Sequence, residues 1–347
     1  MKSSTRTNAS HRFDILMTSC VIVASLLPAT ARSQNAESKV TEQQAMANTG
    51  RTIDDPEQLK RWIQNMVWYH DYRDEHIAIA TGLSVENVKK LRHAMNVSRA
   101  NIPKPPANSP LLMLPYPGGR HPRIGFLDGA LQPQRETKIS VFAPWDQSSY
   151  VVIDVPEAIW SNLGLTYLAH THVDTIWSTK NIKLPQLEWQ LLDDGSLRLE
   201  RKLPNGIVFG SRTKAHRDHV QMEMWLTNGT NEKLSDLRVQ NCVMLRFAKG
   251  FEQQTNDNKV IRESYVACHN ESSTRWLITA WEPNHRPWSN PPCPCLHSDP
   301  KFSDCDPGET KRLRGWFSFF EGSDINAEIK RIDETGWKAH PFLEVAK

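Results

Sequence analysis

The chain has 347 residues, with 42 lysines and arginines against 39 aspartates and glutamates and a formal net charge of +3 at pH 7. This near balance produces no strong electrostatic field, so the sequence argues against nucleic acid or an anionic membrane surface as a partner. The length allows one large domain and a small one, and 22 prolines with 12 tryptophans favour a turn-rich β architecture over a helical bundle.

The first 31 residues have the three parts of a secretory signal peptide. Three basic side chains precede an apolar run over residues 15–27, and Ala29-Thr30-Ala31 then offers a cleavage site. We therefore expect a secreted or periplasmic protein whose mature chain starts at about Arg32. The polar residues 32–52 are expected to form a flexible leader.

The sequence favours a cleaved, exported chain over one that is attached to a membrane. A lipoprotein anchored at Cys20 is the alternative to cleavage, but Met17-Thr18-Ser19 is a poor lipobox and little apolar sequence precedes it. The apolar run of the signal peptide is too short to span a membrane comfortably, and no other stretch is long and apolar enough to do so as a helix.

Residues 53–100 are expected to form a small helical module. The first helix starts at residues 54–57, where an acidic cap is followed by a proline and a glutamate in the first turn. A second helix is expected over residues 73–80, and a third from Ser84, whose hydroxyl can cap the amide of Asn87.

The second and third of these helices resemble a helix-turn-helix, with Gly82 at the turn. In an exported protein DNA binding is not expected, because no exported DNA partner is implied and the third helix carries few cations. The module is instead interpreted as a packing unit, with docking of a protein partner as an alternative role. Residues 101–110 contain four prolines and are expected to form a stiff linker to the next domain.

Residues 111–345 are expected to form a large antiparallel β-sandwich. Asp194-Gly195 and Asn205-Gly206 supply the positive φ angles that tight hairpin turns require, so residues 184–247 are expected to form a meander. Many strands at short intervals, separated by turn residues, are typical of a sandwich. The expected strands cover residues 138–142, 150–155, 165–172, 187–191, 197–201, 207–209, 219–226, 238–247, 260–268, 276–281, 312–320 and 324–332.

The expected strand over residues 219–226 alternates with period two. Val220, Met222, Met224 and Leu226 share the face expected to be buried. The other face carries four polar or aromatic side chains: His219, Gln221, Glu223 and Trp225. Such a face suits a polar ligand, but a polar outer face is more often that of an ordinary solvated strand.

Further candidate binding residues lie in loops and at strand ends. Arg120 and Arg123 lie among glycines and prolines, where a side chain can contact a ligand or hold its own loop. His170 and His172 are two residues apart and share a face, so they could bind one metal ion or one sugar, or pack across strands. The remaining candidates are His216, His285 and Trp288.

Two segments resemble the late strands of a known sandwich. Residues 226–230 (Leu-Thr-Asn-Gly-Thr) and residues 306–310 (Asp-Pro-Gly-Glu-Thr), each followed by a long strand, are similar to those of galactose mutarotases and related carbohydrate-active proteins. The resemblance covers residues 145–335 at most and lacks the mutarotase pattern of catalytic His and Glu. It implies the fold and a carbohydrate ligand. The whole chain also resembles exported bacterial proteins, which implies no mechanism.

Residues 284–305 form the most unusual segment. Five prolines argue against regular structure there, and Cys293, Cys295, His297 and Cys305 lie close together. In an exported protein we expect disulfides, with Cys305 joined to one of the two earlier cysteines, the other pairing with Cys268, and the segment forming a wall of the ligand cleft. The alternative is a zinc site made by Cys293, Cys295, His297 and Cys305, although its Cys-Pro-Cys spacing is unusual for zinc.

The sequence therefore predicts an exported β-sandwich protein that binds or processes carbohydrate, with no cofactor. Aromatic faces can stack on sugars and short polar groups can bind their hydroxyls. If a reaction occurs, Glu223 is the expected base and His219 the expected acid. The alternatives are a non-catalytic surface protein that docks a partner through its helices, and a zinc protein of the cysteine-rich segment.

Overall fold

The computed structural model describes residues 50–120, 135–169 and 173–343. Contacts divide the chain into Met1–Gln43 and Gln44–Lys347, and every residue described below belongs to the second unit. The expected signal peptide, most of the expected leader, Arg123, His170 and His172 lie outside the described residues. Within the described ranges, no helix is long and apolar enough to cross a membrane.

The N-terminal part of the described chain is helical, as its sequence predicts. Its elements are α2 (Pro56–Gln64), the π-helix η1 (Asn65–Tyr69), α3 (Asp74–Thr81), α4 (Val85–Ala94) and the short η2 (Arg99–Asn101). Asp55 caps α2 by accepting a hydrogen bond from the amide of Glu57, and Ser84 caps α4 by accepting one from the amide of Asn87 at 3.2 Å. The apolar faces of these helices bury a small core of their own.

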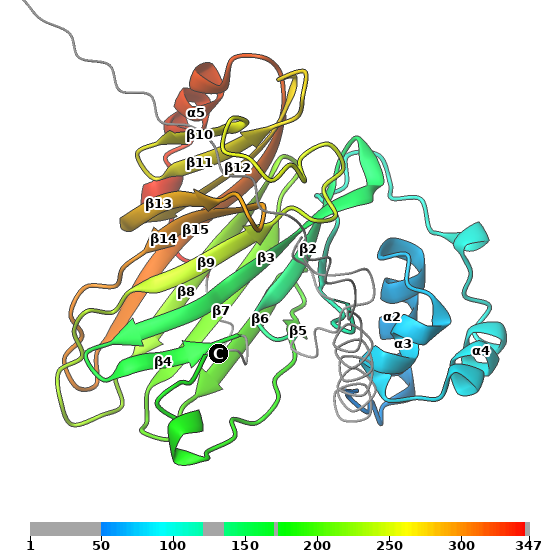
Figure 1. The fold of residues 1–347 in the computed structure, drawn as a ribbon, viewed down its shortest axis with the longest axis horizontal. Helices are drawn as coiled ribbons and strands as arrows, with labels where there is room; N and C mark the ends of the chain where they lie inside the picture. Colours follow the sequence, from blue (N-terminus) through cyan, green and yellow to red (C-terminus); the bar gives the residue numbers. More distant parts are fainter. Residues whose placement is uncertain (1–49, 121–134, 170–172, 344–347) are drawn as a thin grey trace, which may run out of the picture. The chain divides into compact units, whose positions relative to one another are not determined.

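The rest of the described chain is mainly β and contains two antiparallel sheets, which confirms the fold class (Figure 1). Sheet A has the order β1 (Met113–Pro115), β2 (Lys138–Ala143), β3 (Asp146–Ser161), β9 (Val239–Met244), β14 (Cys295–Pro300) and β13 (Asn284–Asn290), with β4 (Gly164–Leu168) also paired to β3. Sheet B has the order β10 (Lys259–Arg262), β11 (Tyr265–His269), β12 (Arg275–Glu282), β15 (Thr310–Glu321), β8 (His219–Thr227), β7 (Val208–Ala215), β6 (Leu197–Lys202) and β5 (Gln190–Leu191).

The main core lies between the two sheets. It takes alternate side chains from both, for example Ile153 of β3 and Phe317 of β15, because successive side chains of a strand point to opposite faces. The apolar face expected for β8 lies in this core. Gly315 is required opposite Trp281, since a Cβ on Gly315 would lie 2.5 Å from an atom of the indole ring.

The strand expected over residues 324–332 is wrong, because this segment is the helix α5 (Ile325–Glu334). Asp324 caps the helix and accepts hydrogen bonds from the amides of Asn326 and Ala327. Ile325 and Ile332 are seven residues apart and both buried, which is the spacing of a helix face rather than of a strand.

The expectation that the proline-rich segment lacks regular structure is also wrong. Residues Asn284–Asn290 and Cys295–Pro300 form the antiparallel hairpin β13–β14. Pro287 is tolerated opposite Ser298 because β13 is the outermost strand of sheet A, where one side of the strand needs no hydrogen-bond partner.

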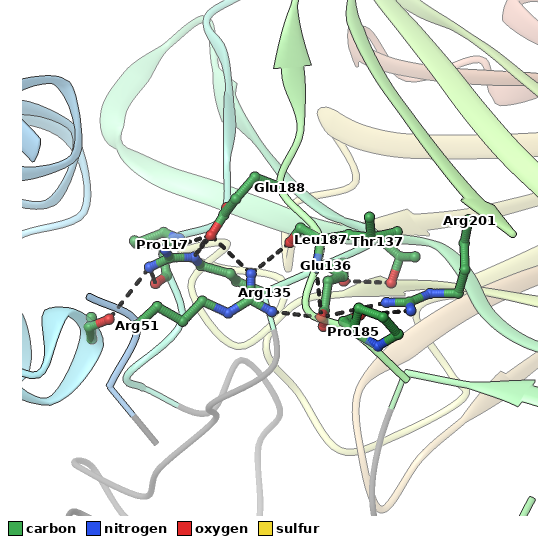
Figure 2. Close-up of polar contacts among 10 residues, drawn as sticks. Arg51, Pro117, Arg135, Glu136, Thr137, Pro185, Leu187, Glu188 and Arg201 are labelled. Atoms are coloured by element: carbon green, nitrogen blue, oxygen red, sulfur yellow. Dashed lines mark hydrogen bonds and ion pairs between the residues drawn. The ribbon is translucent and has the colours of Figure 1, made fainter. Parts of the chain in front are cut away.

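Buried charges connect the helical part of the chain to the sandwich. We call Arg51, Arg135, Glu136, Glu188 and Arg201 the arginine–glutamate cluster (Figure 2). Arg51 lies between the two carboxylates: one Nη is 2.5 Å from Glu136 Oε1 and the other is 2.8 Å from Glu188 Oε1. Glu136 also faces Arg201 at 3.6 Å and accepts a hydrogen bond from the amide of Leu187.

Arg135 extends these contacts to the helices. Its guanidinium lies 4.4 Å from the ring centroid of Trp62 in α2 and donates to the carbonyl oxygen of Ala80 in α3. It also donates to Glu188 at 2.6 Å. A charge this deeply buried is stable only when it is paired and hydrogen-bonded, so the helices and the loops of the sandwich depend on each other here. The domain boundaries expected at residues 100 and 110 stay a prediction.

We expect Glu136→Gln to lower the free energy of unfolding by about 3 kcal/mol, because it leaves Arg51 and Arg201 without a charge that neutralises both. Urea unfolding followed by tryptophan fluorescence would measure the change. The matched control is Asp236→Asn, since Asp236 also contacts two cations, Arg238 and Lys301, but is exposed, and its loss should leave the midpoint unchanged. Equal midpoints for both variants would contradict the structural role of the cluster.

Candidate functional site

The polar face expected for β8 exists, but little open space lies over its first half. The ring of His219 is stacked between His216, with ring centroids 4.4 Å apart, and Trp316, with centroids 3.9 Å apart. His219 Nδ1 also contacts Asp218 at 2.8 Å. The cavity beside His219 and Gln221 has a volume of only about 10 Å³, which is too small for a sugar ring.

The C-terminal segment covers the second half of this face. Glu223 is 1% exposed, and its carboxylate accepts hydrogen bonds from the amide of Leu343 at 2.6 Å and from Gln221 Nε2 at 3.2 Å. Burial raises the pKa of Glu223, while the Leu343 amide and neighbouring arginines oppose that shift. Trp225 is buried as well, and its indole donates to Glu200. As the chain is folded here, Glu223 therefore has no open route to a ligand.

The structure does not bring His285 and Trp288 to this face. His285 and Trp288 lie on β13 in sheet A, whereas His219 and Glu223 lie on β8 in sheet B. His285 is exposed, and Trp288 stacks on His297 with ring centroids 4.0 Å apart. These residues therefore belong to two separate surfaces.

The expected disulfides are absent from the described residues, where none of the five cysteines is bonded to another. Cys305 pairs with Leu234 in an isolated bridge and its thiol donates to the carbonyl of Glu309, so it is held by backbone contacts. The expected zinc set is not assembled either. Cys295 and His297 instead lie beside Cys242 of β9, a residue that the sequence did not single out as a ligand.

A cavity of about 440 Å³ lies where η1 meets sheet A. We call it the aromatic–arginine cavity. Its walls carry four aromatic rings, from Trp68, Tyr69, Tyr150 and Phe247. They also carry four cations against two carboxylates, namely Arg99, Arg120, Arg246 and Lys249 against Asp71 and Glu252. This size and composition are those of a pocket for a small polar ligand, with an excess of positive charge.

Arg120 is the most constrained of these cations. Its guanidinium is clamped between two rings, 4.4 Å from the centroid of Tyr72 and 4.5 Å from that of Phe247. One Nη donates to the carbonyl oxygen of His70 at 2.7 Å and to the hydroxyl of Tyr150 at 2.8 Å. Among the described residues, no carboxylate forms an ion pair with it. The positive charge at the cavity wall is thus fixed in position and not neutralised by those residues.

The buried His70 supports this arrangement through hydrogen bonds to its neighbours. Its Nδ1 donates to the carbonyl of Asn65, because a carbonyl can only accept, so Nε2 accepts from the hydroxyl of Ser140 at 2.7 Å. Its ring contacts Tyr150 edge to face, with centroids 4.9 Å apart. Burial lowers the pKa of His70 from its ordinary 6.5 to about 3; the bond to Asn65 opposes this shift and the charge of Arg120 adds to it.

Sequence reasoning identified only one residue of this cavity. Arg120 is recognisable as a cation in a glycine-rich loop, whereas nothing in the sequence distinguishes His70, which follows the aromatic pair Trp68-Tyr69. A usable signal was present in the strand that contains Tyr150, because Tyr150 and Val152 make the start of its outer face aromatic and apolar, which indicates that this part of the face is covered too.

Comparison with known proteins finds similarity at the level of structure alone. No known sequence family matches the chain, and no curated protein does. A kojibiose phosphorylase from the human microbiome aligns with 8% identity and a TM-score of 0.35, over 56% of this chain and 27% of the phosphorylase. A heparan sulfate lyase mutant from Pedobacter heparinus aligns with 9% identity and a TM-score of 0.32, over 86% of this chain and 48% of the lyase.

A protein from Synechocystis sp. PCC 6803 aligns with 9% identity and a TM-score of 0.31, over 53% of this chain and 88% of its own. The chain thus spans about a quarter of the phosphorylase and about half of the lyase. Two of these three neighbours are carbohydrate-active enzymes, but at such TM-scores the likeness supports no conclusion about the ligand or activity of this chain.

We expect the stability of the protein to fall as the pH is lowered from about 6.5 towards 3, partly because of His70. The unfolded chain binds a proton on this imidazole near pH 6.5, whereas the folded chain does so only near pH 3, so protons favour the unfolded state between these values. The loss of unfolding free energy that His70 causes approaches about 1.4 kcal/mol per pH unit between these pKa values. Urea unfolding at pH 7 and pH 5 would measure it.

In His70→Gln this part of the pH dependence should disappear, since the amide can still bond to Ser140 but cannot titrate. His93→Gln is the control, because His93 is exposed on α4. A His70→Gln variant with the same loss of stability as the wild type between pH 7 and pH 5 would contradict the assignment.

Proposed function

We propose that this is an exported carbohydrate-binding protein, and that the aromatic–arginine cavity binds a saccharide that carries an acidic group. The observation that carries the proposal is Arg120, a guanidinium fixed between Tyr72 and Phe247 at the wall of the cavity. A guanidinium held in one orientation suits a carboxylate or sulfate group, which it can bind with paired, charge-assisted hydrogen bonds.

The rest of the cavity supports a sugar as the body of the ligand. Tyr69 and Trp68 of η1 are half-buried, so part of each ring remains accessible. Aromatic rings can stack on the apolar faces of a sugar, while Gln147, Ser148 and Glu252 offer partners for hydroxyl groups. A volume of about 440 Å³ accommodates one or two sugar rings.

Export is part of the proposal and is supported by the signal-peptide pattern of residues 1–31. The proposal is one of binding without turnover, because the expected catalytic pair, Glu223 and His219, is covered by the C-terminal segment and by stacked rings. Docking of a protein partner by the helices stays a prediction from the sequence.

Isothermal titration calorimetry with digalacturonate and with neutral cellobiose would test this function. We expect the acidic disaccharide to bind more tightly, and its affinity to fall with rising salt. In Arg120→Gln the Kd for digalacturonate should rise about tenfold to a hundredfold, because a hydrogen bond to a charged group contributes about 1.5 to 3 kcal/mol.

Arg246→Gln provides a second test if Arg120→Gln folds poorly, because Arg246 also lines the cavity but is only half-buried. The control is Arg238→Gln, which removes an arginine that lies 5.7 Å from the Trp160 ring, away from the cavity. Equal affinity for both disaccharides, or wild-type affinity in both cavity variants, would overturn the proposal.

A further inference from the structure

One row of side chains crosses the outer face of sheet A, the face turned away from the main core. Lys138 of β2 pairs with Asp154 of β3, and Asp154 pairs with Cys242 of β9. In β14, Leu296 pairs with Val243, so continuing this register by one residue places His297 opposite Cys242. Side chains from neighbouring strands are therefore stacked side by side across this face.

Two sulfur atoms and one imidazole nitrogen converge in this row. The ligand atoms of Cys242, Cys295 and His297 all lie within 4.8 Å of one another. Zinc binds sulfur at about 2.3 Å and imidazole nitrogen at about 2.0 Å, which places neighbouring ligand atoms about 3.5 to 4 Å apart. Small side-chain adjustments would bring these three atoms to a common metal ion. The three residues are at most 2% exposed, so such an ion would be shielded from water.

The ring of His297 is already oriented as a ligand would be. Its Nδ1 lies 2.7 Å from the carbonyl oxygen of Asn241 and must donate to it, so Nε2 is the nitrogen that can bind a metal in place of a proton. Trp288 stacks on the ring at an interplanar angle of 11°, and its indole donates to Asp299 at 2.6 Å. Such outer contacts fix the orientation of metal-binding imidazoles in proteins.

The register argues against a disulfide between the two cysteines. Cys295 pairs with Met244, which is two residues from Cys242, so Cys242 and Cys295 are diagonal neighbours on adjacent strands. Diagonal neighbours have Cα atoms about 7 to 8 Å apart, whereas disulfides need about 4.4 to 6.8 Å. The two thiols are thus close enough to share an ion, while the backbone spacing is too long for a bond between them.

We propose that Cys242, Cys295 and His297 bind one thiophilic metal ion, Zn²⁺ or Cu⁺, as a structural clamp between β9 and β14. Thiolates and imidazole are the ligands that these two ions prefer. The site differs from the set expected from the sequence, since Cys242 takes the place of Cys293 and Cys305. It is also independent of the proposed saccharide site, because none of its three ligands lines the aromatic–arginine cavity.

The test uses the full chain, purified under reducing conditions. After equilibration with Zn²⁺ or with Cu⁺ and removal of excess metal, mass spectrometry of metals should find one ion per chain of at least one of the two. Replacement by Co²⁺ should produce a thiolate-to-cobalt charge-transfer band, and the bound ion should raise the Tm, because a ligand that binds only the folded state stabilises it.

Cys242→Ser and His297→Gln should each reduce the bound metal at least tenfold. The controls are Cys305→Ser and Cys268→Ser, which remove buried cysteines outside the proposed site and should retain one ion per chain. Circular dichroism would confirm that the variants fold, and the cobalt spectrum of the wild type tests the site without any substitution. No stoichiometric metal in the wild type, no cobalt charge-transfer band in a chain that binds Zn²⁺, equal loss in the control variants, or a Cys242–Cys295 disulfide in exported protein would each overturn the proposal.

Discussion

The arginine–glutamate cluster is the contact on which the helical part and the candidate site both depend. Arg51 lies just before α2, Glu136 just before β2, and Glu188 just before β5, so segments distant in sequence share the same charges (Figure 2). Buried charges are unstable unless they are paired. The segments that carry the arginine–glutamate cluster therefore have few alternative ways to pack together. Trp68 and Tyr69 belong to η1 while Tyr150 belongs to β3, so the cluster, together with the His70–Ser140 hydrogen bond, holds the two walls of the cavity face to face.

The outer faces of the two sheets differ in what covers them, and this difference decides where a ligand can bind. On sheet B, Phe342 lies over Arg314 at 3.8 Å and Leu343 donates to Glu223, so the chain covers its own polar face. On sheet A, Tyr116 and Tyr150 pack in a buried cluster under the helices, and a cavity of about 440 Å³ remains at the edge of that cluster. A polar strand face seen in the sequence is therefore a weak guide to a site, because the sequence does not show which segment will cover it.

Local patterns predicted the local structure well. The cap at Ser84 and the alternation of β8 were both confirmed, since each depends on neighbouring residues only. The two wrong predictions of secondary structure have local causes too. The proline-rich segment forms a strand because prolines are tolerated in an edge strand, and residues 324–332 form a helix because the isoleucines of α5 have helical spacing. The candidate site was not predictable in this way. Arg120, His70 and Tyr150 come from three segments whose meeting depends on tertiary packing, and cysteine pairing was inferred from sequence distance rather than from strand register.

Strand register also relates the proposed metal site, Cys242, Cys295 and His297, to the aromatic–arginine cavity. Cys295 pairs with Met244, Met244 pairs with Val152, and Val152 is two residues from Tyr150, so the proposed metal site and the cavity share one face of sheet A. Packed interiors transmit small displacements, because they contain few voids that could absorb them. An ion between β9 and β14 would therefore hold in place the strands that position Tyr150 and, through its hydroxyl, Arg120. A cation clamped between two rings is selective for an acidic group only while those rings stay in position, so rigidity of this sheet would favour the binding proposed for the cavity.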